Sequence, residues 1–155
     1  MIMATAQSTP KAGWEVKTLG EACEIKMGQS PKGNSYNATG EGVPLINGPV
    51  EFGPEAFSKT LRTKFTTAPT KMCQAGDLIL CVRGSTTGRM NIAGYDSCIG
   101  RGVASIRSES HQEWVNQFIS FNRDYIYSLG SGATFPNVSG AILKKIVLPI
   151  PPLAE

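Results

Sequence analysis

The chain has 155 residues, a formal net charge of +3, 41% hydrophobic residues and 17% charged residues. That length suits one domain with its own core, and ordinary apolar content with a small net charge excludes a chain that is disordered throughout. The longest apolar run, residues 78–82, is far shorter than the roughly 20 residues of a membrane-spanning helix. Residues 1–9 lack a basic start followed by an apolar stretch, so no secretory signal is expected and the cytoplasm is the expected compartment.

Short elements are predicted along the first half of the chain. Residues 1–13 are small, polar and aperiodic, which predicts a flexible tail in front of one domain over residues 14–155. Thr18 and Glu21 have the spacing of a capping box, which predicts one or two helical turns. Alternating apolar and polar residues predict strands over 14–17, 23–27 and 43–47, and glycine and proline predict a loop over 28–34.

The middle of the chain contains the strongest strand pattern. Residues 78–83 and 89–93 are predicted to form a hairpin, joined by the flexible polar turn 84–88. A further strand is predicted over residues 102–107. Residues 51–70 are rich in threonine and weakly patterned, so no element is predicted there.

The last third contains the one long helix that the sequence predicts. Ser110 and Glu113 form a second potential capping box, which opens a helix over about residues 111–127. Its apolar residues fall on one broad stripe, which indicates packing against the core rather than a ligand site. A glycine-rich loop over 130–137 follows, then a single turn capped by Ser139 and a last strand over 145–150.

These elements define the expected fold class. The 17 glycines and 10 prolines exceed the usual share, which indicates many turns and hence many short strands. The expected fold is therefore mixed α+β: a β-rich domain of short strands and hairpins with one long packed helix and several loops.

Charge is unevenly distributed along the chain. Residues 56–107 carry eight Lys and Arg against two Asp, whereas residues 1–55 and 108–155 are each slightly acidic. Five of the eight cations are Arg, whose guanidinium group pairs in a two-pronged manner with phosphate and with the guanine edge. The basic block indicates a polyanionic partner, with a merely solvated face as the alternative.

Cysteine and histidine do not indicate a metal site. The four cysteines at 23, 73, 81 and 98 show no C-x-x-C spacing, and His111 is the single histidine. A structural zinc site needs four such ligands at close spacings. Reduced thiols that act as small hydrophobic side chains in a cytoplasmic protein are the expected state, with no metal and no bound cofactor.

Two alternative functions remain open at this point. Glu24 and Lys26 form an E-x-K triplet, and Asp77 heads a strand, so the three could form the acidic site of a small metal-dependent nuclease. The basic block could instead meet an acidic protein, which would make the chain a protein-interaction module. Neither a phosphate-binding loop nor a nucleophile with a histidine base is supported, so a non-catalytic chain is expected.

Five segments form a recognisable series in their order along the chain: Trp14 to Ala22, Gly28 to Pro31, Gly76 to Ser85, Gly132 to Ser139, and Lys145 to Glu155 with its Pro-Pro-Leu-x-Glu stretch. Together they resemble the target recognition domain of the DNA specificity subunit of type I restriction-modification systems. The resemblance covers about residues 14–155. In that family the last stretch leads into a long spacer helix, so the chain is expected to be a first recognition domain, truncated before that helix.

The resemblance implies a function and a set of partners. The domain would read one half of a split target in double-stranded DNA and direct methylation and cleavage by other subunits. Methyltransferase subunits would bind S-adenosylmethionine and modify adenine, and a restriction or motor subunit would use ATP and Mg²⁺. The chain itself would need no cofactor and would not enter a membrane.

Candidate DNA-binding residues follow from the loop chemistry and the basic block. Base-edge contacts need planar or short polar groups on loops, whereas phosphate contacts need cations. The candidates for base contacts are Gln29, Ser30, Asn47, Arg83, Ser85, Thr86, Thr87, Arg89, Arg101, Thr134 and Asn137. The candidates for phosphate contacts are Lys59, Lys64 and Lys71, and Lys32 is a candidate for either role.

Overall fold

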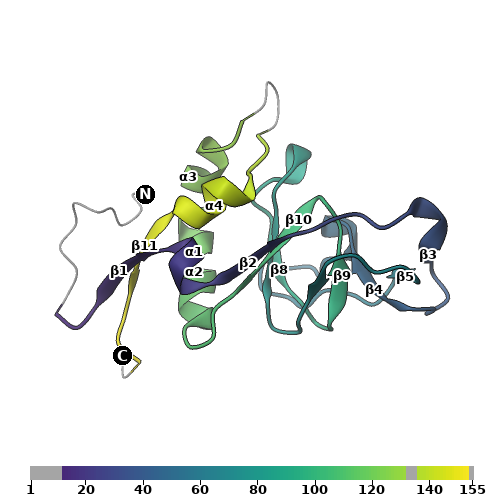
Figure 1. Ribbon diagram of the computed structural model, residues 1–155, viewed down its shortest axis with the longest axis horizontal. Coiled ribbons are helices and arrows are strands. Elements are labelled where there is room, and N and C mark those ends of the chain that lie inside the picture. The colour runs from purple at the N-terminus through teal and green to yellow at the C-terminus, as the bar shows by residue number, and fades with distance from the viewer. Residues whose placement is uncertain (1–11, 132–135, 154–155) are drawn as a thin grey trace.

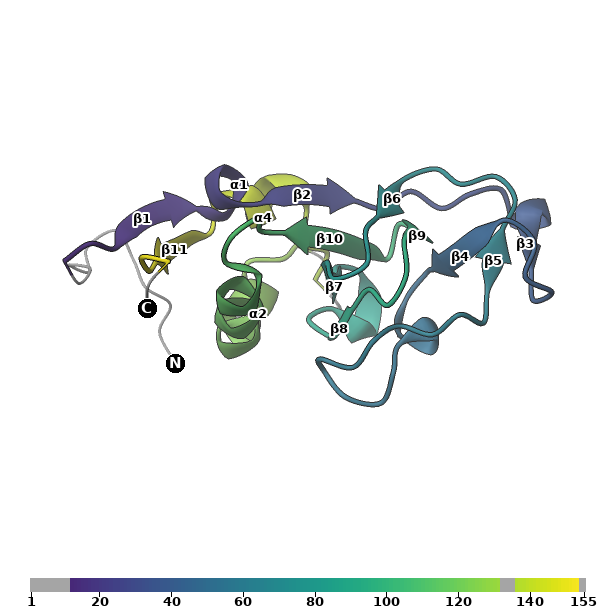
Figure 2. The same ribbon diagram turned by 90° about the horizontal axis from the view of Figure 1, so that it is seen from below.

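The structure is a computed structural model that describes residues 12–131 and 136–153. Three sheets follow one another along its long axis (Figure 2). A two-stranded sheet lies at one end, a four-stranded sheet occupies the middle, and a five-stranded sheet forms the other end. Helices pack beside the two-stranded and four-stranded sheets (Figure 1). This arrangement confirms the mixed α+β class with short strands.

The elements are short, as the many turn residues predict. The strands are β1 (Glu15–Thr18), β2 (Glu24–Met27), β3 (Tyr36–Asn37), β4 (Val43–Ile46), β5 (Phe65–Thr66), β6 (Met72–Cys73), β7 (Leu78–Cys81), β8 (Met90–Ile92), β9 (Ser97–Ile99), β10 (Val103–Arg107) and β11 (Val147–Ile150). The α-helices are α1 (Leu19–Ala22), α2 (Gln112–Phe121), α3 (Arg123–Ser128) and α4 (Gly140–Lys145), and the 3-10 turns are η1 (Gly33–Ser35), η2 (Pro49–Glu51) and η3 (Gly84–Thr86).

The central sheet has the order β2-β10-β7-β8 with every pair antiparallel. The predicted hairpin is confirmed, since Leu78 of β7 faces Ile92 of β8 and Leu80 faces Met90. Both faces of β7 are buried. Leu78 and Leu80 point into one apolar cluster with α2, α3 and α4, whereas Ile79 and Cys81 point into a second cluster beside the five-stranded sheet. A strand that is covered on both faces needs an unbroken apolar run, which explains its sequence.

The two ends of the described chain meet in the outer sheet. β1 and β11 pair antiparallel, with Glu15 opposite Ile150 and Thr18 opposite Val147. Trp14 and Trp114 contact each other edge to face, with ring centroids 5.4 Å apart. Nothing in the sequence pattern predicted this pairing between the first and the last strand, because their separation along the chain leaves no local signal.

Two of the three predicted helix caps are confirmed. The Thr18 backbone N–H donates to Glu21 Oε1 at 2.8 Å, and the Glu21 N–H donates to Thr18 Oγ1 at 3.2 Å, which completes the capping box of α1. The hydrogen bond from the Thr18 backbone also lowers the pKa of Glu21. At α4, Ser139 Oγ accepts from the Ile142 N–H at 3.2 Å.

The predicted capping box at Ser110 is wrong. α2 begins at Gln112, and its N-cap residue, His111, makes no side-chain capping bond. The Gln112 side chain instead reaches back, and its Oε1 accepts from the Ser108 N–H at 2.8 Å. This contact satisfies the backbone N–H of Ser108, and Ser110 is exposed.

The single helix predicted over 111–127 is also wrong, because it is divided at Asn122. The Asn122 side chain donates from Nδ2 to the Phe118 carbonyl at 2.9 Å, and its backbone has φ −101° and ψ 18°. An amide that bonds to the backbone in this way competes with helix continuation. The apolar stripe nevertheless packs on the core through Val115, Ile119 and Ile126.

In the five-stranded sheet, the sequence pattern predicted β4, as residues 43–47, but missed the other four strands. β9 pairs in parallel with β4, with Ile46 opposite Ile99, and antiparallel with β6. β3, β5 and β6 have two residues each, which is too short for an alternation of apolar and polar residues to show.

All four cysteines are free thiols, as expected. Cys73, Cys81 and Cys98 are buried, and Cys23 is half-buried. Burial raises the pKa of Cys23, Cys73 and Cys81 to about 11, so these thiols stay protonated and pack as apolar groups.

The predicted tail 1–13 falls mostly on residues 1–11, which lie outside the described residues. Among the described residues, no helix has the length and apolar character needed to cross a membrane.

Candidate nucleic-acid interface

The turn between β7 and β8 is a well-bonded projection. Gly84 and Gly88 have φ of 72° and 97°, a region that favours glycine, so both ends of the turn depend on this residue type. The Gly88 N–H donates to the Cys81 carbonyl at 2.9 Å, and the Cys81 N–H donates to the Arg89 carbonyl at 2.8 Å, which closes the turn. Ser85 is exposed at the tip. The turn is therefore a short segment whose backbone conformation is fixed by hydrogen bonds.

Thr87 joins this turn to the end of the glycine-rich loop. Its side chain is buried, and Oγ1 lies 2.9 Å from both the Gly84 carbonyl and the Pro136 carbonyl. The Val138 N–H donates to the Val82 carbonyl at 2.8 Å on the same side. Two loops far apart in sequence are thus joined, on the same edge of the molecule as α3 and α4 (Figure 1).

Three predicted loops line one cavity of about 290 Å³. It is lined by Arg83 beside the β7–β8 turn, Asn137 at the end of the glycine-rich loop, Gly28 directly after β2, and Arg101 between β9 and β10. Among the described residues that line this cavity none is acidic, and Arg83 and Arg101 are its two cationic residues. Guanidinium and amide groups are the side chains that pair with guanine and adenine edges.

The end of β2 is packed tightly against residues 99–103. Gly28 donates its N–H to the Val103 carbonyl at 3.0 Å, and a Cβ at Gly28 would lie 2.0 Å from the Gly100 carbonyl oxygen. Ser30 Oγ accepts from the Arg101 N–H at 3.2 Å, so this hydroxyl holds the Arg101 backbone in place. Gln29 is exposed beside it.

The remaining candidates are not gathered at this cavity. Arg89 lines a different cavity that shares no residue with the first. Lys64 lies over the Tyr36 ring, with Nζ 5.6 Å from the centroid, and the Asn47 amide donates to the Tyr36 hydroxyl at 3.4 Å. Lys32, Lys59 and Lys71 are exposed on the part of the chain that contains the five-stranded sheet and its loops. Thr134 lies outside the described residues, and Thr86 is half-buried beside the tip.

Sequence reasoning missed several residues that border these cavities. Ser131 and Ser139 line the first cavity with Asn137, and Arg123 lines the second with Arg89. Arg123 lies in the segment that the sequence predicts to be a core helix, so it is not among the predicted DNA contacts. Its signal would have been its place directly after the helix-breaking Asn122.

The nuclease alternative does not fit the arrangement of Asp77. Both carboxylate oxygens of Asp77 are held by Arg107, at 2.8 Å from Nε and 3.1 Å from Nη2, and the side chain is 2% exposed. Lys26 Nζ donates to the Met72 carbonyl at 2.7 Å. The described residues contain no group of His, Cys, Asp and Glu side chains suited to a metal ion. Asp77 therefore forms an ion pair with Arg107, and neither of its carboxylate oxygens is left free to bind a metal ion.

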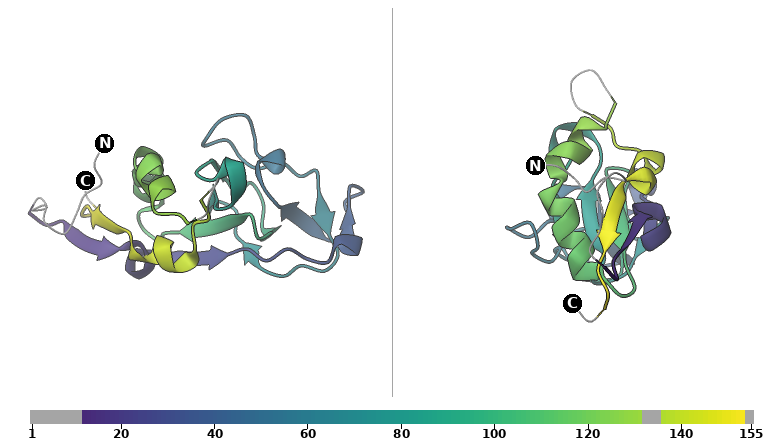
Figure 3. Two further views of the ribbon diagram at one scale, coloured as in Figure 1. Left: turned by 90° about the horizontal axis from the view of Figure 1, so that it is seen from above. Right: turned by 90° about the vertical axis from the view of Figure 1, so that its left-hand side faces the viewer.

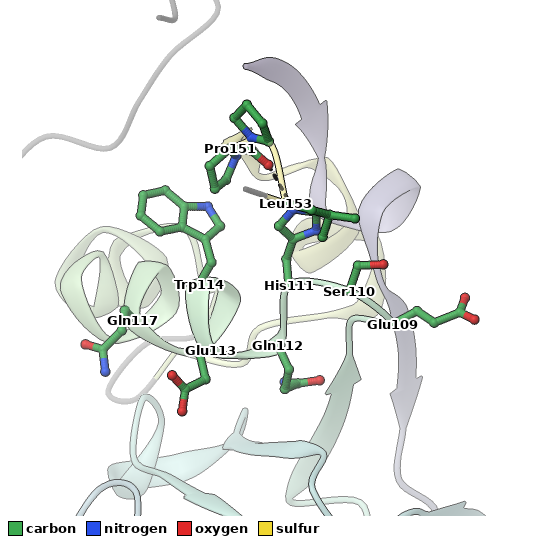
Figure 4. A pocket seen from close by; sticks show the side chains of 10 residues that line it. Glu109, Ser110, His111, Gln112, Glu113, Trp114, Gln117, Pro151 and Leu153 are labelled. Atoms are coloured by element: carbon green, nitrogen blue, oxygen red, sulfur yellow. Dashed lines mark hydrogen bonds between the residues drawn. The ribbon is translucent and has the colours of Figure 1, made fainter. Parts of the chain in front are cut away.

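A cavity of about 540 Å³ lies between the start of α2 and residues 151–153 (Figure 4). His111 is bound to the Pro151 carbonyl through Nε2 at 2.8 Å, and Trp114 Nε1 donates to the Pro149 carbonyl at 2.6 Å. The single histidine thus fastens the last strand to α2, and none of the predicted DNA contacts lies here.

The chain has relatives among known proteins. A family model described as the type I restriction modification DNA specificity domain matches residues 11–155. The chain belongs to this family. Membership in a family of specificity domains, whose partner subunits perform the catalysis, agrees with a non-catalytic chain and argues against the nuclease alternative.

Individual relatives point the same way. The chain is 39% identical over 147 residues to a curated protein of Methanocaldococcus jannaschii named as the type I restriction enzyme MjaX specificity subunit, covering 92% of this chain and 34% of that protein. It is similar to the HsdS subunit from Thermoanaerobacter tengcongensis, with TM-score 0.82, 30% identity, and coverage of 97% of this chain and 36% of that one.

A chain from a structure of complex assembly in a type I restriction-modification system matches equally well, with TM-score 0.82 and 30% identity. That match covers 98% of this chain and 37% of the other. The chain therefore spans about a third of the length of these relatives.

Proposed function

We propose that this domain recognises a short sequence in double-stranded DNA, as one of the reading units of a type I restriction-modification complex. The proposal rests above all on the cavity where Arg83, Arg101 and Asn137 meet, because these are the side chains that read base edges, brought together from three separate loops. Family membership over nearly the whole chain supports the same function.

We further propose the partners that this function requires. The domain would supply one half of a bipartite target, and methyltransferase subunits with S-adenosylmethionine and a restriction or motor subunit with ATP and Mg²⁺ would act on the DNA that it selects. Such a complex works on DNA in the cytoplasm. The curated relative is named as a specificity subunit of a type I restriction enzyme, which supports this assignment.

The proposal predicts the way in which binding energy is divided. Lysines such as Lys64 and Lys71 would contact phosphates and contribute to affinity on any sequence, whereas Arg83 and Arg101 would contribute mostly on the cognate sequence. Ser30 and Thr87 would act by holding the loops, because their hydroxyls are already bonded to backbone groups.

The test is a selection of bound duplexes from a random-sequence pool by the purified 155-residue chain. We expect enrichment of one motif of a few base pairs, and a roughly five- to 150-fold loss of affinity for that motif in Arg83→Ala or Arg101→Ala, which corresponds to about 1–3 kcal/mol. Lys17→Ala removes a cation from β1 of the two-stranded sheet, and Lys17 is not among the residues that line this cavity, so this variant is the matched control.

Failure of the pool to yield any motif, together with binding that does not weaken with salt, would contradict the proposal. An acidic protein partner bound in preference to DNA would favour the interaction-module alternative instead.

A further inference from the structure

A second cationic cavity of about 320 Å³ lies between the β7–β8 turn and α3. It is lined by Thr87, Gly88, Arg89, Arg123, Asp124 and Tyr127. Seen from above in Figure 3, α3 and η3 lie next to each other on the face that is turned toward the viewer. The cavity thus borders the opposite end of the turn from Arg83.

The break in the long helix is what places Arg123 at this cavity. Asn122 is 2% exposed and bonds to the end of α2, so α3 starts anew at Arg123. Ile126, three residues on, is 2% exposed and anchors α3 in the core. The buried Asn122 and Ile126 therefore fix the orientation of the first turn of α3.

Gly88 receives the aliphatic part of Arg123. A Cβ at Gly88 would lie 3.1 Å from Arg123 Cγ and 3.4 Å from Cδ, so the arginine stem packs directly on the glycine. Arg123, which is exposed, thereby lines the same cavity as Arg89. The positive φ of Gly88 and this close contact both require glycine at the same position.

The charges in this cavity favour an anion. In the parts of the chain that the structure describes, neither Arg89 nor Arg123 has a carboxylate within 4.0 Å. Asp124 is the one acidic residue among the lining side chains, which leaves an excess of positive charge. A phosphate oxygen can accept hydrogen bonds from both exposed guanidinium groups, and Tyr127, which is 40% exposed, adds a hydroxyl donor.

We infer that this cavity binds a phosphodiester group of the DNA backbone, with Arg123 as a phosphate-contacting residue. The inference rests on the proposed function and extends it: the turn is flanked by Arg83 and Arg101 at one end and by Arg89 and Arg123 at the other. The first pair reads bases, and the second pair fixes the position of the turn on the duplex, because phosphate contacts orient a protein without reading sequence.

The test measures binding of Arg123→Gln to the selected duplex and to a scrambled duplex over a range of salt concentrations. We expect both affinities to fall by the same factor, about eightfold at 0.1 M salt, and the slope of log K against log salt to become shallower by about 0.9. Arg123→Lys should recover most of the loss, and Asp124→Asn should strengthen binding to both duplexes. Lys17→Ala is again the control.

A second arm separates backbone phosphate from free phosphate. This arm measures the binding of inorganic phosphate to the protein without DNA, beside the affinity for both duplexes. If Arg123→Gln lowers the binding of inorganic phosphate but leaves the affinity for both duplexes unchanged, the cavity binds the free ion only, and the inference is overturned.

The inference and the proposed function fail differently. If the wild type selects a motif but Arg123→Gln and Asp124→Asn leave affinity and salt slope unchanged, the second cavity makes no contact with DNA and the inference is overturned while the function stands. If Arg123→Gln weakens only the selected duplex, Arg123 reads a base and the inference is again overturned. A wild-type chain that binds no duplex overturns both.

Discussion

Replacing Asp77 by Asn should destabilise the domain strongly. Asp77 Oδ1 accepts from Arg107 Nε, and Oδ2 accepts from both Arg107 Nη2 and the Gln74 N–H at 2.9 Å. Asparagine keeps one oxygen but puts an NH₂ donor in place of the other, so at least one donor of Arg107 or Gln74 faces another donor. The residue lies at the start of β7, the strand buried on both faces.

The magnitude follows from burial. Removing one partner of a fully buried ion pair costs about 3–5 kcal/mol. The side chain of Arg107 is 25% exposed and keeps access to water, and Glu24 lies 3.5 Å from its Nη1, so the penalty is reduced to about 2–3 kcal/mol. With a urea dependence of about 2 kcal/mol/M, the unfolding midpoint should fall by about 1–1.5 M urea.

The assay is urea unfolding followed by circular dichroism, with plasmid nicking in Mg²⁺ measured on the same samples. Glu24→Gln is the matched control, since its carboxylate is mostly exposed and its removal should change the midpoint little. An unchanged midpoint for Asp77→Asn would refute the reasoning. An unchanged midpoint together with nicking that only the wild type shows would restore the nuclease alternative.

Three further outcomes are expected. Thr18→Ala should lower the free energy of unfolding by about 1 kcal/mol through loss of the α1 cap, measurable by urea unfolding. Gly88→Ala should cost about 1–2 kcal/mol, because alanine is strained at a φ of 97°, and unfolding curves identical to those of the wild type would contradict this. Cys73 and Cys81 should resist alkylation at pH 8 in the folded state. Because folding raises their pKa from about 9 to about 11, the stability from their burial is complete below pH 9 and is lost as pH rises through 11.

Local chemistry made parts of the site predictable. Arg83 and Arg101 were found from a basic block, and Asn137 from a glycine-rich loop, and the structure brings these three to one cavity. The sequence predicts Ser30 and Thr87 as base contacts because they are hydroxyl residues in loops. It does not show that both hydroxyls form hydrogen bonds with backbone groups. Whether a short polar side chain faces solvent or its own chain depends on neighbours that are distant in sequence.

Arg89 illustrates the same limit from the other side. Arg89 follows the turn that Arg83 precedes, and the sequence predicts both as base-contacting residues. The two nevertheless line different cavities. Arg89 shares its cavity with Arg123. Arg123 lies in a segment that the sequence predicts to be one continuous helix packed on the core. The small backbone deviation at Asn122 was enough to alter the surface at that point.

The sequence by itself determined the class of fold, the central hairpin, two helix caps and the chemistry of the loops, because each depends on residues within a few positions of one another. Only the tertiary structure decided that β1 pairs with β11, that Arg107 forms an ion pair with Asp77, and which arginines line the same cavity. These are contacts between distant segments, and their geometry is set by the packing of both faces of β7, to which no single stretch of sequence gives access.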